Sequence, residues 1–189
     1  MSEKIRYAAR DARIVAEWLV SQLEPGCVRI QIAGSVRRER VEVGDIEIVY
    51  VPMVETRPDP ADLFGPEISV NLTDERIAVL ERANALARRR NRNGSEMFGQ
   101  CNKFMVHVGS GIPVDLFSTQ EACWFNYVVC RTGGMKNNLQ IAKAAQRKGW
   151  KWNPYGRGFS KGEKCFQVES ERDVYGFVGL PWKEPRERQ

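Results

Sequence analysis

The chain has 189 residues, of which 42% are hydrophobic and 28% are charged, and it carries a formal net charge of +5 with a pI near 9.0. This composition is that of an ordinary soluble globular protein of one or two domains, and the basic excess is a modest bias towards polyanionic partners such as nucleic acid. No apolar run approaches the ~20 residues that span a membrane, and the first residues lack the apolar core of a signal peptide, so we expect a cytoplasmic protein with no membrane partner.

The cysteines and the histidine argue against a zinc site. Five cysteines are scattered without a CxxC pair, and the chain has one histidine. An odd, scattered set of this kind is typical of reduced thiols in a cytosolic protein.

In the first two thirds of the chain, the hydrophobic periodicity alternates between helical and strand patterns. A helix is predicted over residues 6–23, followed by strands over 27–34 and 43–51 and a loop over 57–67 that contains three prolines. A second helix is expected to begin near Thr73 as its N-cap and to carry Ile77, Leu80 and Leu86. Two further strands are predicted over 103–108 and 112–117. These elements predict a mixed sheet with helices that ends near residue 130.

The last third has a different character. We expect a turn at 131–134, a helix over 136–149, a small hairpin, a short helix and an extended tail. Residues 136–164 contain eight basic residues against one acid, and they interleave four aromatic residues. Basic side chains neutralise phosphates while rings stack on bases, so this surface favours nucleic-acid binding. At least one of Trp150 and Trp152 is expected in the core instead.

Two carboxylates lie on one face of the second predicted strand. Asp45 and Glu47 project together while Ile46 and Ile48 project oppositely, and Asp115 is a third acid in an apolar strand. Three convergent carboxylates suit Mg²⁺, and two such ions suit in-line phosphoryl chemistry. Acids at i and i+2 alone are more typical of the solvated face of an edge strand.

The turn before this strand supports the catalytic alternative. Gly34 and Ser35 offer backbone N–H groups and a hydroxyl to phosphate oxygens, and Arg38 offers a charged fork. A phosphate-binding turn followed ten residues later by metal-binding acids is what a nucleoside triphosphate–Mg²⁺ substrate requires. This constellation, and not the Gly-Ser pair alone, carries the prediction.

Several motifs together resemble a known family. "GSVRR" (34–38), "GDIEI" (44–48) and "PVDLF" (113–117) look like the palm signature of nucleotidyltransferases of the DNA polymerase beta superfamily. "RTGGMKNN" (131–138), "GWKWNPYG" (149–156) and "SERDVYGFVGLPWKEPRERQ" (170–189) are similar to segments of the X family of DNA polymerases. The resemblance covers nearly the whole chain.

The resemblance implies an α+β fold. A nucleotidyltransferase palm, a mixed sheet with helices on one face, would occupy residues 1–129. A small α+β thumb that binds nucleotide and DNA would occupy residues 130–189. The chain offers no room for the lyase and helix-hairpin-helix domains that larger members carry at the N-terminus.

The resemblance also implies roles for individual residues. The catalytic metal ligands would be Asp45, Glu47 and Asp115. The nucleotide contacts would be Lys4, Gly34, Ser35, Arg38, Gly44, Cys130, Arg131, Gly133 and Asn138. The resemblance gives Lys103 as a DNA contact, and the basic surface of the last third adds Lys136, Lys148 and Lys161 as candidates. Arg37 is expected to support the Gly-Ser turn rather than to bind the nucleotide.

Three positions depart from the family pattern. Glu47 stands where the family has aspartate, and its extra methylene must be accommodated. Cys130 and Arg131 replace an aromatic pair that crowds the sugar, which opens the question of ribonucleotide discrimination. Pro113 replaces a basic residue that many members have two positions before the third acid.

The resulting expectation is a monomeric, Mg²⁺-dependent DNA polymerase, with Mn²⁺ able to substitute. It would bind gapped or primer-template DNA, add dNMP from a dNTP to a primer 3′-hydroxyl and fill short gaps in repair. The alternatives are a nucleotidyltransferase that needs no template or uses ribonucleotides or RNA, and a non-catalytic nucleic-acid-binding module. The segment "ARRRNRNG" (87–94) is interpreted either as a DNA-backbone contact or as a solvated helix end.

Overall fold

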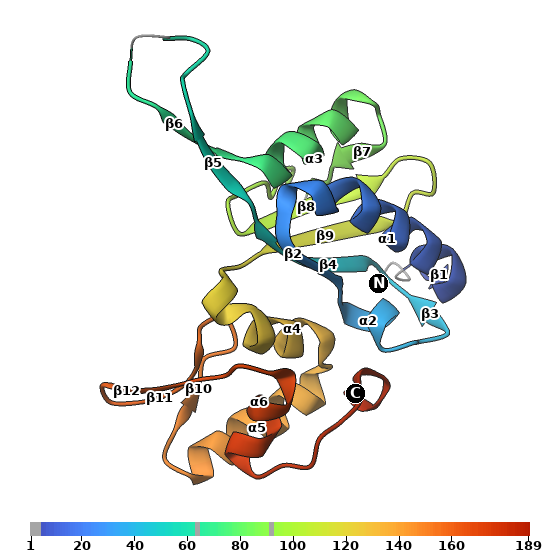
Figure 1. Ribbon diagram of the computed structural model, residues 1–189. Coiled ribbons are helices and arrows are strands. Elements are labelled where there is room, and N and C mark those ends of the chain that lie inside the picture. The colour runs from blue at the N-terminus through green and yellow to red at the C-terminus, as the bar shows by residue number, and fades with distance from the viewer. Residues whose placement is uncertain (1–4, 63–64, 91–92) are drawn as a thin grey trace.

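The computed structural model describes residues 5–62, 65–90 and 93–189. Its centre is a five-stranded sheet in the order β2-β4-β9-β8-β7 (Figure 1). The strands are β2 (Cys27–Ile32), β4 (Ile46–Pro52), β9 (Pro113–Ser118), β8 (Asn102–His107) and β7 (Leu86–Arg88). The β4–β9 pair is parallel and the other three pairs are antiparallel, so the sheet is mixed as expected.

Two helices cover one face of this sheet. These are α1 (Ala9–Leu23) and α3 (Leu72–Arg82), which pack their apolar stripes onto the alternate strand residues Ile46, Ile48 and Leu116. All three of these strand side chains are fully buried. We call this surface the helix face, and it forms the larger core of the molecule.

The opposite face of the sheet meets the C-terminal region. Helix α4 (Trp124–Thr132) packs against Val49, Val51 and Phe117, which alternate with the residues of the helix face. Glu47 and Asp115 share the orientation of Val49 and Phe117, because side chains two positions apart on a strand point the same way. We call this surface the acid face.

The C-terminal region has a core of its own. Helices α5 (Met135–Arg147) and α6 (Glu171–Val178) pack with a small antiparallel sheet of β10 (Lys151–Trp152), β11 (Gly158–Lys161) and β12 (Lys164–Gln167). Trp152 is buried and donates its indole N–H to Asn126 Oδ1, whereas Trp150 is half-buried against Phe177. The expected division of the two tryptophans between core and surface thus places Trp152 in the core.

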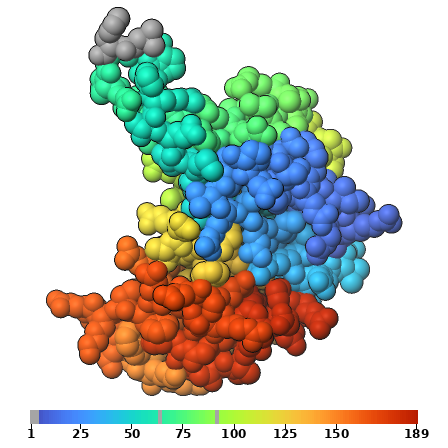
Figure 2. Space-filling view, viewed as in Figure 1, coloured from blue at the N-terminus to red at the C-terminus, as the bar shows by residue number. Residues whose placement is uncertain are grey.

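Three smaller units complete the chain. Strands β5 (Val54–Arg57) and β6 (Ile68–Asn71) form a hairpin that projects from the body (Figures 1 and 2). Strand β1 (Tyr7–Ala8) pairs with β3 (Glu42–Val43). The short helix α2 (Gly34–Arg37) follows β2 directly. Single 3-10 turns occur at Glu24–Gly26, Glu121–Cys123 and Pro185–Glu187. No helix in the described part of the chain has the length and apolar character needed to cross a membrane.

The structure corrects the prediction for the second helix at both ends. Its N-cap is Asn71, whose side chain accepts from the Asp74 N–H, while Thr73 lies inside the helix with its hydroxyl donating to Gly26 O at 2.6 Å. Leu86 does not belong to the helix, which ends at Arg82; it begins strand β7 and is buried against the sheet. Asn84, at φ +55°, lies in the turn between them.

Candidate active site

The predicted catalytic acids lie along one edge of the acid face. Glu47 on β4 and Asp115 on β9 are direct neighbours in the parallel register, and Asp45 immediately precedes β4. The sheet therefore brings Glu47 and Asp115 side by side, and it places Asp45 at the end of the same strand. The alternative of a solvated edge strand does not apply, because β4 is an interior strand between β2 and β9.

The Gly34–Ser35 turn contacts Glu47 directly. Gly34 has φ +59°, and a Cβ built there would lie 1.9 Å from Glu47 Oε2. Only glycine combines this backbone conformation with this close approach. The extra methylene of Glu47 is accommodated because its carboxylate occupies the space that a side chain at position 34 would need.

The acids share a crowded electrostatic environment. Burial, reinforced by the charge of Asp45, raises the pKa of Glu47 to about 7, while Arg131 acts in the opposite direction. Burial also raises the pKa of Asp115, although Arg89 opposes this shift. A cluster of like charges that resists ionisation is stabilised by a cation.

The donor set fits divalent magnesium, which prefers carboxylate oxygens. Within the described residues, however, no three acidic, His or Cys side chains are grouped around one metal position. At Asp115, Arg89 Nη2 lies 2.7 Å from Oδ1. The Arg89 guanidinium thus pairs with one of the two carboxylate oxygens of Asp115.

A basic cleft adjoins the turn. It has a volume of about 600 Å³ and is lined by Ser35 and Arg38, as predicted for phosphate contacts, together with Arg6, Arg40, Val41 and Glu42. Gly44, whose amide was assigned to the same phosphates, is buried between the turn and the acid edge. Lys4 lies outside the described residues.

Two arginines of the turn reach the C-terminal region. Arg37 donates to Thr132 Oγ1 at 2.8 Å and pairs with Glu171 at 2.6 Å, so it joins α2 to α4 and α6 rather than supporting its own turn. Arg38 donates from Nη1 to the Thr132 carbonyl at 2.5 Å, and its Nε is buried without a partner. The Arg38 side chain therefore links the basic cleft to the end of α4.

The predicted sugar and base contacts gather where α4 ends and α5 begins. Asn138 donates from Nδ2 to the Cys130 carbonyl at 2.8 Å and to the Gly133 carbonyl at 3.3 Å. Gly133 is held tightly, since a Cβ there would lie 2.2 Å from Asn138 Oδ1. The half-buried Cys130 and the Gly133 turn are thus ordered by Asn138 itself.

The side chain of Arg131 does not join the group around Asn138, and it lies against aromatic rings instead. Its guanidinium carbon is 3.5 Å from the centre of the Phe117 ring and 5.1 Å from that of Tyr155. In this position the guanidinium faces the sheet and contributes to the field at Glu47. Its Nε is buried with no hydrogen-bond partner.

Comparison with known proteins identifies the C-terminal region and the fold. A family model described as the DNA polymerase beta thumb matches residues 127–189. A crystal structure of Leishmania infantum polymerase beta in a ternary P/T complex superimposes with a TM-score of 0.74 at 17% identity, over 98% of this chain and 77% of that chain. The ternary gap complex of the same protein gives a TM-score of 0.74 at 16% identity, over 98% and 71%. No curated protein matches the sequence.

The chain has a polymerase beta-like fold, and its last third matches the model of the polymerase beta thumb. These findings confirm the α+β fold class. The matched range begins within α4, close to the boundary that was expected after residue 129, but the division into two domains stays a prediction.

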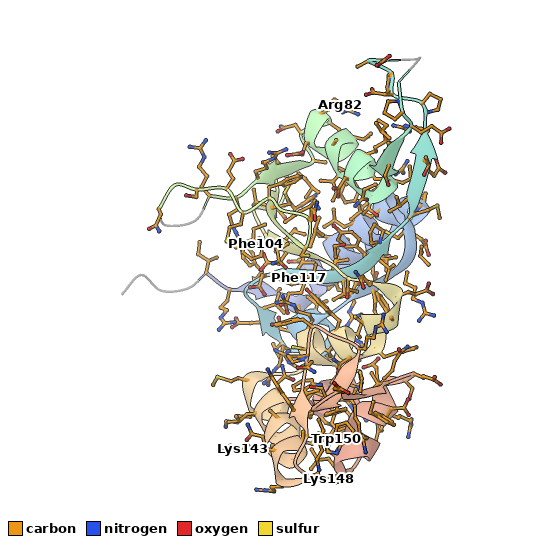
Figure 3. All side chains as sticks on the ribbon, turned by 90° about the vertical axis from the view of Figure 1, so that its left-hand side faces the viewer. Arg82, Phe104, Phe117, Lys143, Lys148 and Trp150 are labelled. Carbon is orange, nitrogen blue, oxygen red and sulfur yellow. The ribbon has the colours of Figure 1, made fainter. Side chains whose placement is uncertain are left out.

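The four lysines assigned to DNA lie in unlike places. Lys136, at the start of α5, and Lys161, at the end of β11, are exposed. Lys148 donates to the Phe177 carbonyl at 2.6 Å, at the end of the thumb remote from the palm sheet (Figure 3). Lys103 is only 1% exposed and points to the helix face, where its ammonium contacts Gly99 O and Asp74. This burial argues against a phosphate contact from Lys103.

Three arginines near the site were not singled out from the sequence. Arg6 and Arg40 line the basic cleft, and Arg89 forms an ion pair with Asp115. The basic residues around the Gly-Ser turn were a usable signal for Arg40. Arg89 was considered only as part of segment 87–94, which was interpreted either as a DNA-backbone contact or as a solvated helix end, so its contact with Asp115 was missed.

Proposed function

We propose that this protein is a Mg²⁺-dependent DNA polymerase of the X-family type, which adds dNMP to a primer 3′-hydroxyl and releases pyrophosphate. The observation that carries the proposal is the pairing of Glu47 with Asp115 across adjacent strands, in contact with the Gly34–Ser35 turn and its basic cleft. Short gap filling in DNA repair is the role that the family relation favours, and gapped or primer-template DNA is the partner.

The residues of the cleft would hold the triphosphate. Ser35 offers a hydroxyl, Gly44 an amide, and Arg38 a guanidinium that stabilises the charge of the departing pyrophosphate. Arg6 and Arg40 line the same cleft and would add charge at its outer part. Catalysis of phosphoryl transfer is largely this positioning and charge neutralisation.

The acids would hold two divalent ions and the primer end. Asp45 and Glu47 would ligate both ions, and Asp115 would ligate one and accept a hydrogen bond from the primer 3′-hydroxyl. When bound, the ions supply Lewis-acid activation of the 3′-hydroxyl and neutralise phosphate charge. Within the protein, the sheet fixes the spacing of the two central carboxylates, and the thumb contacts of Arg38 tie the phosphate cleft to the nucleotide turn.

The test is primer extension on gapped, templated and single-stranded DNA, with each dNTP and rNTP supplied separately. Template-directed dNMP addition on gapped DNA is the expected result. Addition that ignores the template base would contradict the proposal and favour a template-independent nucleotidyltransferase. Tight DNA binding without incorporation of any nucleotide would favour a non-catalytic module.

One observation favours a second candidate, a polymerase that also accepts ribonucleotides. Cys130 places a small side chain beside the sugar turn, and the Arg131 guanidinium lies over Phe117 rather than at that turn. No aromatic ring from positions 130 and 131 then crowds a 2′-hydroxyl. Comparable rates with dNTP and rNTP on the gapped substrate would support this candidate, and strong preference for dNTP would remove it.

A further inference from the structure

A row of side chains crosses three strands of the sheet on the acid face and ends at a residue just beyond a fourth strand. Asp115 on β9 has Glu47 on β4 as one neighbour and Phe104 on β8 as the other. The row continues past Phe104, because the Arg89 N–H donates to the Phe104 carbonyl at 2.9 Å, just beyond the end of β7. The order across the sheet is therefore Glu47, Asp115, Phe104 and Arg89.

Arg89 reaches back over this row to the acid. Its guanidinium carbon lies 5.1 Å from the centre of the Phe104 ring, and its Nη2 donates to Asp115 Oδ1 at 2.7 Å. Phe104 is itself fixed by an edge-to-face contact with Phe117, at 6.3 Å between ring centres, and the two rings lie near the junction with the thumb (Figure 3). The ring forms a surface that directs the guanidinium to the carboxylate.

The two partners differ in exposure. The side chain of Asp115 is 15% exposed and that of Arg89 is 33% exposed. Asp115 is held by an interior strand, whereas Arg89 follows a three-residue strand at the edge of the sheet. Arg89 can therefore rotate into solvent while Asp115 stays in place.

We propose that Arg89 is the resident counter-ion of Asp115 and that a divalent ion must displace it from the acid edge. Arg89 is then a positioning residue: it neutralises and orients Asp115 in the metal-free protein and withdraws when the metal binds. This inference rests on the proposed function, because it takes Asp115 as a metal ligand. It also accounts for Pro113, since the charge missing from β9 is supplied from the end of β7, with β8 between the two strands.

The neighbouring arginine provides a matched control. Arg88 pairs with Glu81 at 2.8 Å and lies over the Phe98 ring at 3.9 Å, so it has the same kinds of contact in the same segment without touching the acid edge. Loss of a guanidinium at position 88 tests the general effect of removing charge from this strand end. Loss at position 89 tests the contact with Asp115.

The experiment is titration of the full chain with Mn²⁺ in the absence of DNA and nucleotide, with free Mn²⁺ read by electron paramagnetic resonance. The proteins are wild type, Arg89→Met, Arg89→Lys and Arg88→Met, each checked for folding by circular dichroism. Arg89→Met is expected to bind Mn²⁺ on the order of tenfold more tightly, because a competing charge-assisted hydrogen bond and a repelling charge are removed. Arg89→Lys retains the charge and stays near wild type, and Arg88→Met is unchanged.

A double-mutant cycle distinguishes displacement of Arg89 by the metal from a purely structural role of Arg89. In an Asp115→Asn background, the addition of Arg89→Met is expected to give no further tightening, because the competing pair is already gone. Unchanged or weaker Mn²⁺ binding by Arg89→Met would overturn the inference and show that Arg89 supports Asp115 in the loaded state. Absence of Mn²⁺ binding in every variant would instead remove the metal assignment of the proposed function, and the inference with it.

Discussion

The two faces of the central sheet use the same strands for opposite purposes. On the helix face, Ile48 and Leu116 are fully buried among apolar neighbours. On the acid face, their immediate chain neighbours Glu47 and Asp115 hold carboxylates in partly buried positions, where burial raises the pKa of both. The apolar residues of the helix face thus stabilise the sheet, whereas the partly buried carboxylates of the acid face carry an electrostatic cost.

This difference indicates which residues serve folding and which serve chemistry. Partly buried like charges with raised pKa values are typical of functional sites. The helix face should respond to substitution through stability. The carboxylates of the acid face should respond through activity, with stability unchanged or improved.

The largest expected effect is loss of catalysis in Asp115→Asn. We expect nucleotide incorporation to fall by at least about 10³-fold, equivalent to ~4 kcal/mol in the activation free energy, because the amide is a poor metal ligand and a poor acceptor for the primer hydroxyl. Binding of gapped DNA should remain near wild type. Single-turnover incorporation measures the first quantity and fluorescence anisotropy the second.

The matched control is Val114→Ala, one residue earlier on the same strand and directed to the helix face. It should reduce stability but leave incorporation per folded molecule close to wild type. Retained activity in Asp115→Asn, or an equal loss in both variants, would contradict the assignment of the two faces.

The second effect is destabilisation by Ile48→Ala. Truncation of this fully buried side chain should lower the free energy of unfolding by about 2–5 kcal/mol, from lost apolar burial and the cavity left behind. Urea denaturation monitored by circular dichroism gives the value, with an unchanged m-value as the check on two-state unfolding. A change below ~1 kcal/mol would mean that the helix face repacks and is not the main core.

The third effect concerns pH and Glu47. Its pKa in the folded protein is raised to about 7 from the ordinary value of 4.5, so the folded state binds a proton that the unfolded state releases between these values. Stability of the metal-free protein should therefore fall as pH rises from about 4.5 to about 7, by ~3 kcal/mol. Glu47→Gln removes the ionisation, and it should be more stable than wild type at neutral pH.

Urea denaturation in EDTA at a series of pH values measures this difference. Wild type and Glu47→Gln should converge at low pH and diverge as the pH approaches 7. Added Mg²⁺ should narrow the gap, because metal binding favours the ionised carboxylate. A Glu47→Gln protein that is less stable than wild type at neutral pH would show that the carboxylate is satisfied in the metal-free fold.

The acid face was the more predictable of the two in sequence. Isolated acids at positions 45, 47 and 115 break apolar strands, and strand alternation assigns their face without knowledge of the sheet order. Their proximity required the parallel β4–β9 register, which only the structure provides. The roles given to these acids stay predictions.

The missed features depend on tertiary contacts. Leu86 continues the helical spacing of Ile77 and Leu80, yet the turn at Asn84 ends the helix and the sheet takes Leu86 into β7. With that segment assigned to a helix, nothing could place Arg89 beside Asp115. Thr73 was likewise predicted as the N-cap of the helix, but its buried hydroxyl donates to the Gly26 carbonyl instead.

Lys103 provides a further test of the difference between the two faces, because it is a charged residue on the helix face. Its register partner is Leu116, its side chain is 1% exposed, and its ammonium contacts Tyr50, Gly99 and Asp74. A lysine that contacts a DNA phosphate releases a counter-ion and steepens the salt dependence of binding, which a buried ammonium cannot do.

Lys103→Met should therefore have the smallest effect on DNA. We expect affinity for gapped DNA to change by less than about twofold per folded molecule, with the slope of log K against log salt unaltered. The exposed Lys136→Met should weaken binding several-fold and reduce that slope by about one. Anisotropy titrations at several salt concentrations measure both. A flatter slope for Lys103→Met but not for Lys136→Met would contradict this expectation. The ammonium of Lys103 would then have to leave the helix face in the DNA complex, and β8 would not separate a stabilising face from a functional face.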